Sequence, residues 1–405
     1  MKQHPLRRQD HTAFIATTLL LLAALPALAI GMFAVQRAVH EEPEASILEL
    51  VRLSRAFTQP VVKPAVVKGV YLTSNTAGSD IRRGEIFDMI DRTELNTAVI
   101  DIKTAKGLLA YPAGVQVAQD AGVIAENPYD LDAILADARS RGIYTIARLP
   151  VFEDTALAVA RPDFALKTKG GGFWLNRKGV AWLDMTNEDV WAYTAALVND
   201  ALARGFNEVQ LDYVRFPSDG DLSDAVYQNW SEDSGVPRYV VIGKFFSYIR
   251  EHVPQGRLSA DLFGLTMDAS SHSDNDLFIG QRLGDGLASF DVISPMIYPS
   301  HYAPFYAGYQ NPASAPGGVI SNTLDAAQSF LETLPRQEGE SPYHDIRPWL
   351  QDFNLGAIYT PQMVRTEIDT AEARGVDGWL LWDPGNTYTE AALKPASVLN
   401  SSVTQ

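Results

Sequence analysis

Short apolar runs that alternate with amphipathic segments are the feature of this sequence that most constrains its fold. Eight runs are typical of β-strands: Val66–Thr73, Thr97–Lys103, Tyr144–Pro150, Glu208–Val214, Leu258–Phe263, Asp291–Ile297, Ile346–Gln351 and Gly378–Trp382. The segments between them are long enough for helices, most clearly Ile81–Arg92, Leu131–Arg141, Asp189–Arg204, Val240–His252, Thr323–Leu334 and Pro361–Arg374. Strands that alternate with helices form parallel sheets. Eight such units predict an α/β fold, a (β/α)8 TIM barrel over residues 66–395, with a doubly wound open sheet as the alternative.

A charge-free segment near the N-terminus predicts a membrane anchor. Residues 12–35 carry no charged side chain, and Lys2, Arg7 and Arg8 precede them. At about 1.5 Å per residue such a helix crosses a hydrocarbon core of about 30 Å, and the basic residues favour keeping its start in the cytoplasm. A possible cleavage site at 27–29 makes a removable signal peptide the competing interpretation of residues 1–36. Either way, we expect an extracytoplasmic protein, periplasmic or on the cell surface, and residues 12–35 as its membrane contact.

Composition limits the chemistry of the rest of the chain. Residues 37–65 are expected to form a stalk and residues 396–405 a tail. The absence of cysteine excludes disulfides, thiolate metal sites and cysteine nucleophiles. The formal net charge of −16 opposes polyanions, so we expect no nucleic-acid partner. The histidines show no metal-site spacing, and no P-loop, dinucleotide or serine-esterase motif occurs. We therefore expect no cofactor and no metal, with a metal-dependent deacetylase or other hydrolase as a minor alternative.

Acidic residues stand where the predicted strands end, which is where TIM barrels carry their chemistry. They are Asp101, Asp212, Asp261, Asp352 and Asp383. Alternation along the strands places Asp101 beside Lys103 and turns Asp212 inward. A single acid at a strand end is more often a cap, a turn former or an ion-pair partner, and this is the preferred interpretation of Asp352 and Asp383. Several acids on one rim nevertheless repel one another unless basic groups, a substrate or raised pKa values offset their charge.

Aromatic residues lie at the same strand ends. They include Tyr71, Tyr213, Phe216, Phe263, Tyr298, Trp349, Trp379 and Trp382. The apolar faces of sugar rings stack on aromatic side chains, although filling the mouth of the barrel explains any single one of them equally well. Trp174 follows three glycines, and we expect it to be an exposed ring on a mobile loop, with a plain turn as the alternative.

Six strings carry a resemblance to a known family. They are GVYLT at 69–73, VIDIK at 99–103, WLD at 182–184, QLDYVRFP at 210–217, ADLFG at 260–264 and SPMIYP at 294–299. Together they resemble the DUF4015-type glycoside hydrolase family over about residues 66–390, and the DYVRFP string is the most specific. The resemblance implies a TIM barrel and a glycosidase activity, which for much of the family is assigned by similarity of fold.

Glycoside hydrolysis requires two carboxyl groups on either side of the scissile bond, and Asp212 and Asp261 are the candidate pair. Neighbouring strands lie about 4.8 Å apart, so a carboxyl separation of about 5–5.5 Å is attainable, which is the retaining geometry, whereas about 6.5–9.5 Å indicates inversion. We expect Asp212 to be the nucleophile, held ionised by Arg215 or Lys103. We expect Asp261 to be the acid/base, with a pKa raised by neighbouring acids and by Phe263.

The remaining candidates are expected to bind or orient the sugar. They are Asp101, Lys103, Tyr213, Arg215, Tyr298, Trp349, Trp382, Asp383 and Trp174. Asp101 is at least as well explained by pairing with Lys103 or Arg215. The sequence thus predicts a glycoside hydrolase acting on an extracytoplasmic polysaccharide or glycan, with a carbohydrate as its partner. A non-catalytic glycan-binding barrel of the cell envelope is the alternative.

Overall fold

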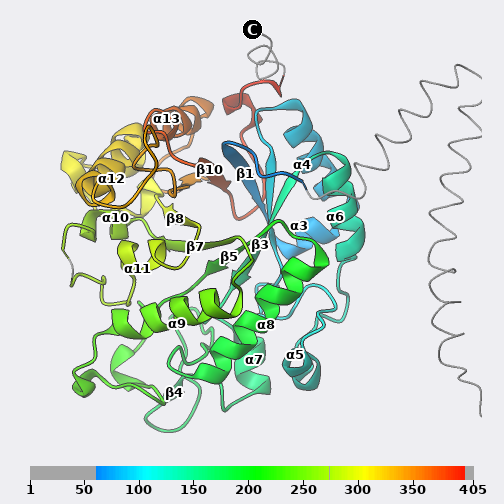
Figure 1. Ribbon diagram of the computed structural model, residues 1–405, viewed down its shortest axis with the longest axis vertical. Helices are drawn as coiled ribbons and strands as arrows, with labels where there is room; N and C mark the ends of the chain where they lie inside the picture. The colour runs from blue at the N-terminus through cyan, green and yellow to red at the C-terminus, as the bar shows by residue number, and fades with distance from the viewer. Residues whose placement is uncertain (1–60, 273, 397–405) are drawn as a thin grey trace, which may run out of the picture. The chain divides into compact units, whose positions relative to one another are not determined.

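Eight parallel strands close into a barrel in the computed structural model, which describes residues 61–272 and 274–396 (Figure 1). The strands are β1 (Val67–Leu72), β2 (Thr97–Asp101), β3 (Tyr144–Pro150), β5 (Glu208–Asp212), β7 (Leu258–Phe263), β8 (Val292–Met296), β9 (Trp349–Gln351) and β10 (Gly378–Trp382). They follow the barrel in chain order, and β10 pairs with β1 to close it. The predicted TIM barrel is therefore confirmed, and the open sheet is wrong. The short strands β4 (Lys167–Thr168) and β6 (Ala225–Val226) form a separate antiparallel pair.

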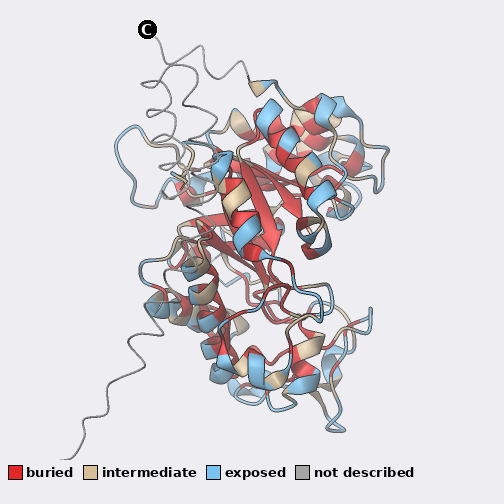
Figure 2. Cartoon of the chain, turned by 90° about the vertical axis from the view of Figure 1, so that its right-hand side faces the viewer, coloured by how far each residue is buried: buried red, intermediate tan, exposed pale blue. Residues whose placement is uncertain are grey.

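Helices surround the barrel, and the strands lie buried inside them (Figure 2). The helices are α3 (Ser74–Gly78), α4 (Asp80–Arg92), α5 (Gln116–Ala121), α6 (Leu131–Ser140), α7 (Thr155–Ala160), α8 (Glu188–Arg204), α9 (Arg238–His252), α10 (Leu265–Ala269), α11 (Leu283–Leu287), α12 (Pro316–Leu331) and α13 (Pro361–Glu372). Helix α8 illustrates how the sequence sets their ends. Asn187 caps its first turn by accepting the N–H of Asp189 at 2.9 Å, and Gly205 ends it with a φ of 110°.

Two predicted strands end earlier than expected, both at an acid of the candidate site. The fourth strand of the barrel, β5, stops at Asp212 rather than Val214, because Tyr213 has a φ of 55°. The second, β2, stops at Asp101 rather than Lys103, which pairs in an isolated antiparallel bridge with Leu109. These changes of direction separate Lys103 from the inward face that alternation had predicted for it.

Helix α12 begins seven residues before the predicted Thr323, although its first turn contains a proline and two glycines. Proline is tolerated at the first position of a helix because its N–H would be unpaired there. The glycines are required by close packing. A Cβ on Gly317 would lie 2.7 Å from the Cγ2 atom of Thr366 on α13, and one on Gly318 would overlap the ring of Tyr309.

The interior of the barrel combines an apolar cluster with buried ion pairs. The cluster contains Val67, Tyr71, Val99, Tyr144, Ile146, Tyr298, Trp349 and Leu380. Deeper in the barrel, Glu208 of β5 is fully buried and pairs with Arg347. It also accepts hydrogen bonds from the hydroxyl groups of Ser259 at 2.5 Å and Tyr144 at 3.1 Å. This network joins β3, β5 and β7 below the mouth of the barrel.

The predicted anchor, residues 12–35, lies outside the described residues, as do most of the predicted stalk and tail. Across residues 61–272 and 274–396, no helix is both long and apolar enough to span a bilayer. The end of the predicted stalk lies against the barrel. The carbonyl oxygen of Val61 accepts a hydrogen bond from Asn207 at 3.1 Å, and Lys63 pairs with Asp377 at 2.8 Å.

Candidate active site

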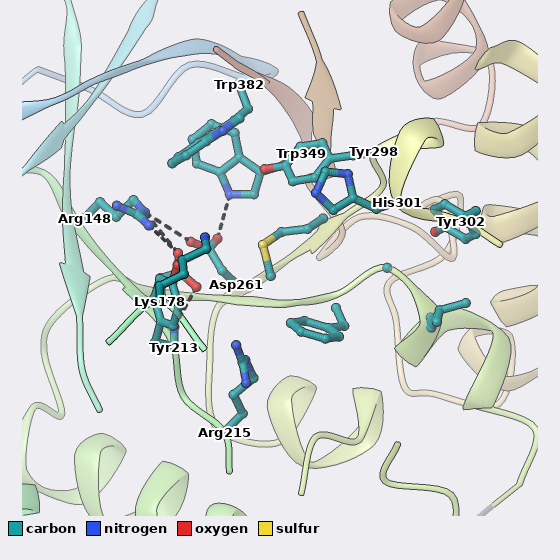
Figure 3. A pocket seen from close by; sticks show the side chains of 15 residues that line it. Arg148, Lys178, Tyr213, Arg215, Asp261, Tyr298, His301, Tyr302, Trp349 and Trp382 are labelled. Carbon is teal, nitrogen blue, oxygen red and sulfur yellow. Dashed lines mark hydrogen bonds and ion pairs between the residues drawn. The ribbon is translucent and has the colours of Figure 1, made fainter. Parts of the chain in front are cut away.

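A cavity of about 450 Å³ opens at the C-terminal ends of the strands (Figure 3). Its lining comes from β3, β5, β7, β8, β9 and β10 and from the loops that follow them. The residues are Arg148, Lys178, Asp212, Tyr213, Arg215, Asp261, Phe263, Gly264, Leu265, Met296, Tyr298, His301, Tyr302, Trp349 and Trp382. The cavity therefore lies at the end of the barrel where this fold places its active sites.

The two predicted catalytic carboxyl groups both line this cavity, on the neighbouring strands β5 and β7. Arg148 of β3 bridges them. Its Nε atom lies 3.2 Å from Oδ2 of Asp212 and 3.9 Å from Oδ2 of Asp261, so these two oxygens are at most about 7.1 Å apart, the sum of the two distances. This limit includes the retaining separation of about 5–5.5 Å and the lower end of the inverting range.

Arg148, and not Arg215 or Lys103, holds the Asp212 carboxylate. The Nη2 atom of Arg148 lies 2.5 Å from Oδ2 of Asp212, and its Nη1 atom lies 2.6 Å from Oδ1 of Asp101. The sequence contains a signal for this partner, although Arg148 was not among the predicted site residues. Tyr144, Ile146 and Arg148 alternate along one strand, so an arginine stands in a series of side chains that face the barrel interior.

The surroundings of Asp261 favour its protonated form. This residue is 1% exposed, and this burial, followed by the nearby Asp212 charge, raises the pKa of Asp261 well above its usual range. Three groups act in the opposite direction: the Arg148 guanidinium, the indole N–H of Trp349, which donates to Oδ1 of Asp261 at 2.7 Å, and the charge of Arg347.

The backbone at Asp212 is unusual. Tyr213 has a φ of 55°, a conformation that residues with a Cβ rarely adopt, and its N–H donates to Oδ1 of Asp212 at 2.6 Å. Backbone strain of this kind costs about 1–3 kcal/mol and is concentrated at functional sites. Here it turns the Tyr213 side chain into the cavity lining and leaves Asp212 with hydrogen bonds on both oxygens.

Aromatic side chains form the opposite wall of the cavity. The rings of Tyr71 and Trp382 stack with centroids 4.0 Å apart, and Trp349 meets Trp382 edge-on at 5.4 Å. The Arg148 guanidinium lies over both stacked rings, 5.3 Å from the centroid of Tyr71 and 5.0 Å from that of Trp382. The structure thus brings Tyr213, Tyr298, Trp349 and Trp382 to the cavity, as the sequence predicted.

Asp101 lies behind the cavity lining rather than in it. Its Oδ2 atom accepts the hydroxyl hydrogen of Tyr71 at 2.5 Å, and its Oδ1 atom pairs with Arg148. Burial raises the pKa of Asp101, and Arg148 opposes that shift. The side chain therefore holds Arg148 and Tyr71 in place, with Arg148 as its basic partner instead of the expected Lys103 or Arg215.

Three other predicted binding residues lie away from the cavity. Lys103 is buried and donates to Oδ2 of Asp154 at 2.7 Å, which places it beside the start of α7. Asp383 accepts the N–H groups of Gly385 at 2.6 Å and Thr387 at 3.1 Å, and is thus the turn former that its position had suggested.

Trp174 is the third, and the expectation of an exposed ring is wrong. The side chain is 1% exposed, its indole N–H donates to the carbonyl oxygen of Asp221 at 2.7 Å, and its ring meets Trp182 edge-on at 6.4 Å. A loop that follows consecutive glycines can fold back on the protein as readily as it can extend. Only the contacts of the folded chain decide between the two.

Lys178, His301 and Tyr302 also line the cavity, and the sequence did not single them out. Lys178 stands in the turn between Leu175 and Ala181, which pair in an antiparallel bridge, and nothing in the local pattern directs that turn toward the barrel mouth. Within the described part of the chain, no three or more His, Asp or Glu side chains lie close enough together to hold a metal ion.

Comparison with known proteins identifies one family and several similar structures. Residues 69–388 match the family model DUF4015, described as "Putative glycosyl hydrolase domain". A hypothetical protein from Ruminiclostridium thermocellum ATCC 27405 is 33% identical, with a TM-score of 0.44, over 47% of this chain and 96% of that chain. None of the curated proteins compared with this chain matches it.

Two sugar-cleaving enzymes are also similar. The α-galactosidase TtGalA from Thermus thermophilus is 16% identical, with a TM-score of 0.47, over 84% of this chain and 66% of that chain. Alpha-L-fucosidase isoenzyme 2 from Paenibacillus thiaminolyticus is 13% identical, with a TM-score of 0.52, over 81% of this chain and 47% of that chain. This chain spans about half the length of the fucosidase, and the likeness concerns the fold alone.

Proposed function

This chain belongs to the DUF4015 family of glycosyl hydrolase domains, and from that premise we propose that it is a glycosidase whose catalytic pair is Asp212 and Asp261. The observation that carries the proposal is the unequal environment of two neighbouring carboxyl groups in one cavity. Asp212 bonds to a guanidinium, whereas burial and the Asp212 charge favour a proton on Asp261. Glycoside hydrolysis requires one carboxylate and one carboxylic acid on either side of the bond that breaks.

The retaining reaction assigns a step to each group. An oxygen of Asp212 bonds to the anomeric carbon while the bond from that carbon to the leaving oxygen breaks, and Asp261 gives its proton to the leaving oxygen. A water molecule then attacks the same carbon, returns a proton to Asp261 and releases Asp212. Asp261 thus acts first as an acid and then as a base, and each cycle leaves the enzyme unchanged.

The surrounding residues position these two groups. Arg148 compensates the charge of Asp212 and, through Asp101 and Tyr71, is fixed against the aromatic wall. Trp349 holds Asp261 by one hydrogen bond, and the partly exposed ring of Trp382 offers its surface to a sugar. The two Oδ2 atoms are at most about 7.1 Å apart, a limit that allows the retaining separation of about 5–5.5 Å, and we propose retention on neighbouring strands. The anomeric configuration of the first product, followed by NMR, distinguishes retention from inversion.

A glycan-binding barrel without catalysis is the second candidate, and one observation favours it. Asp212 receives two N–H groups of Arg148 on the same oxygen, and a carboxylate held in this way is a weaker nucleophile. Such a protein would bind a glycan in the same cavity and release it uncleaved.

An activity screen of the full chain against bacterial envelope polysaccharides and exopolysaccharides tests the proposal. We expect turnover by the natural sequence, a loss of about a thousandfold or more in Asp212→Asn, and retained binding in that variant. The control is Asp233→Asn, which changes an exposed carboxyl group outside the cavity. Glycan binding without turnover in both the natural chain and Asp212→Asn would establish the binding module. Full turnover by Asp212→Asn would overturn the catalytic pair.

We also propose that the barrel acts outside the cytoplasm, anchored through residues 12–35. The support is the charge-free apolar segment with basic residues before it. A C-terminal fusion to a reporter that is active only after export should be active with the full chain and lose activity when residues 1–36 are removed. An inactive reporter on the full chain, or a reporter that stays active after residues 1–36 are removed, would contradict this location.

A further inference from the structure

One buried arginine of the cavity differs from the others in the described part of the chain. The buried arginines are Arg83, Arg148, Arg215 and Arg347. Three of them have a carboxylate within 4.0 Å, whereas Arg215 has none among the described residues. Removing a guanidinium from water without an acidic partner is costly, so the position requires a compensating interaction.

The hydrogen bonds of Arg215 leave part of its guanidinium unused. Its Nη1 atom donates to the carbonyl oxygen of Phe216 at 3.0 Å and to the hydroxyl of Ser218 at 3.2 Å. Its Nε and Nη2 atoms have no hydrogen-bond partner among residues 61–272 and 274–396. Figure 3 shows the guanidinium end of Arg215 turned toward the cavity, where these N–H groups are available to a ligand.

Aromatic rings fix the orientation of this side chain. The Cζ atom of Arg215 lies 5.0 Å from the ring centroid of Trp182, 5.6 Å from that of Tyr213 and 4.8 Å from that of Phe263. Cation–π contacts stabilise the charge without using the N–H groups at its edge. The guanidinium is thus held rigidly, which lowers the entropy lost when a ligand binds it.

The nearest acids do not replace an ion-pair partner. Asp212, Glu153 and Asp219 favour the charged form of Arg215, but burial outweighs them and lowers the pKa of its guanidinium. Asp212 is already bound to Arg148, and Glu153 accepts a hydrogen bond from Asn176 at 3.1 Å. Arg215 is therefore a buried cation whose Nε and Nη2 groups have no hydrogen-bond partner among the described residues.

A second cation, Lys178, lines the same cavity. Lys178 is exposed on the turn between Leu175 and Ala181, and its ammonium group makes no ion pair or hydrogen bond with the described residues. Lys178 acts on Glu153 only at longer range, where its charge lowers the pKa of that carboxyl group against the effect of burial. The chain as a whole carries a net charge of −16, so two cations without an ion pair among the described residues beside one cavity contrast with the general composition. The long-range field of the acidic surface is screened beyond about 8 Å at physiological ionic strength, which leaves the local charges to act on a bound ligand.

We propose that the substrate is an acidic glycan and that Arg215 and Lys178 bind the carboxylate of its sugar acid. The proposal rests on the proposed glycosidase function and names the substrate class of that site. The free N–H groups of a guanidinium match the two oxygens of a planar carboxylate, and an ammonium can approach the same group as a point charge. The sugar ring itself would lie between Asp261 and the face of Trp382, with its acidic substituent toward the loop after β5.

Matched pairs of sugars that differ in the acidic group test the proposal with the full chain. The pairs are glucuronic acid and glucose, galacturonic acid and galactose, and N-acetylmuramic acid and N-acetylglucosamine, with glucose 6-sulfate as a separate anion. Titration calorimetry should show about tenfold or tighter binding of at least one acid than of its neutral partner. Tighter binding of the sulfate than of every carboxylate would assign the site to sulfated glycans and overturn the carboxylate.

Variants separate the two cations from the rest of the site. We expect Arg215→Met to abolish the preference for the acid and Lys178→Met to reduce it about two- to fivefold. Arg177→Met is the matched control, since it changes the adjacent exposed cation that does not line the cavity, and it should leave the preference intact. Lys178→Met decides the question if Arg215→Met does not fold, because Lys178 is exposed.

The possible failures of this proposal and of the glycosidase are distinguishable. Binding or cleavage of neutral glycans without preference for acids, or a preference that survives both variants, would overturn the acidic substrate and leave the glycosidase standing. If the folded chain binds neither member of any pair and cleaves no glycan in the activity screen, the proposed function fails, and this inference fails with it.

Discussion

At the scale of single residues, one arginine connects three aspartates at the cavity. Arg148 contacts Asp101, Asp212 and Asp261, and their charges hold the pKa of its guanidinium well above the usual value, against the effect of burial. The three acids are of one chemical type, yet only Asp261 combines almost complete burial with a lining position. Differences between neighbouring groups, rather than the identity of the side chain, distinguish the proposed acid, Asp261, from the proposed nucleophile, Asp212.

The pH dependence of kcat/KM should report this difference. Loss of the proton from Asp261 should produce the alkaline limb, because the acid must be protonated in the free enzyme. The N–H of Trp349 stabilises the ionised form of Asp261 and so lowers its pKa. Trp349→Phe removes that donor, so the pKa of Asp261 should rise and the alkaline limb should move to higher pH by about one unit.

Trp382→Phe is the matched control for that experiment. Trp382 also lines the cavity and stacks on Tyr71, but it makes no hydrogen bond to Asp261 among the described residues. Its replacement should change KM and leave the alkaline limb in place. A limb that stays fixed or moves to lower pH in Trp349→Phe would show that Asp261 is not the group that titrates.

At the scale of elements, the sequence predicted what periodicity can encode and missed what contacts decide. Strand β3 and helix α9 occur where the spacing of apolar residues predicted them. An element that buries one face needs apolar residues at a regular interval, and that interval is visible in the sequence. The exact ends of β2 and β5 depend on single backbone angles and bridges, which leave no periodic trace. The loop that buries Trp174 was missed for the same reason, since its partners lie on other segments.

One buried acid, Asp352, follows β9 directly and binds the loop after β10. Asp352 accepts the backbone N–H of Thr389 at 2.8 Å and its hydroxyl hydrogen at 2.6 Å. Burial raises the pKa of Asp352 to about 7, even though these hydrogen bonds lower it. Between about pH 4 and pH 7 the unfolded chain has lost this proton and the folded chain keeps it, so the free energy of unfolding decreases as pH rises through that window.

Asp352→Asn should remove that contribution, because an amide carries no charge: its oxygen can accept the N–H of Thr389, and its NH2 group can donate to the Thr389 hydroxyl oxygen. We expect the variant to match the natural chain at pH 4 and to exceed it by about 1–3 kcal/mol at pH 8. Thermal unfolding from pH 4 to pH 8 measures the difference, with Asp233→Asn as the exposed control. A variant that loses stability at high pH would show that the ionised carboxylate is favoured in the folded state.

At the scale of the whole molecule, closure of the barrel creates the site. Counting eight strand-like runs was sufficient to predict the barrel and to place Asp212 and Asp261 on one rim. The strand pattern does not predict which basic residue pairs with which acid. Arg148, Asp101 and Asp212 come from three strands, and they meet only when the barrel closes. The pairing expected for Lys103 was wrong on this account, since a change of direction after Asp101 carries that side chain to Asp154.

A glycine lies at the seam where the first and last strands pair and close the barrel. Gly378 of β10 pairs with Val67 of β1 and has a φ of 147°, and a Cβ there would lie 2.7 Å from the backbone N and C atoms of Val67. Gly378→Ala combines an unfavourable backbone angle with a clash against main chain, so we expect a loss of about 2–5 kcal/mol in the free energy of unfolding.

Urea unfolding followed by tryptophan fluorescence measures that loss, and Gly84→Ala supplies the contrast. Gly84 lies in the interior of α4, where a Cβ meets nothing within 4 Å, so the same substitution should stabilise the protein by about 0.5–1 kcal/mol. Pairing of β1 with β10 completes the closed barrel. Weakening this contact should therefore lower the stability of the whole barrel rather than unfold one edge. A Gly378→Ala variant as stable as the natural chain would mean that the two ends of the sheet are not held together at this pair.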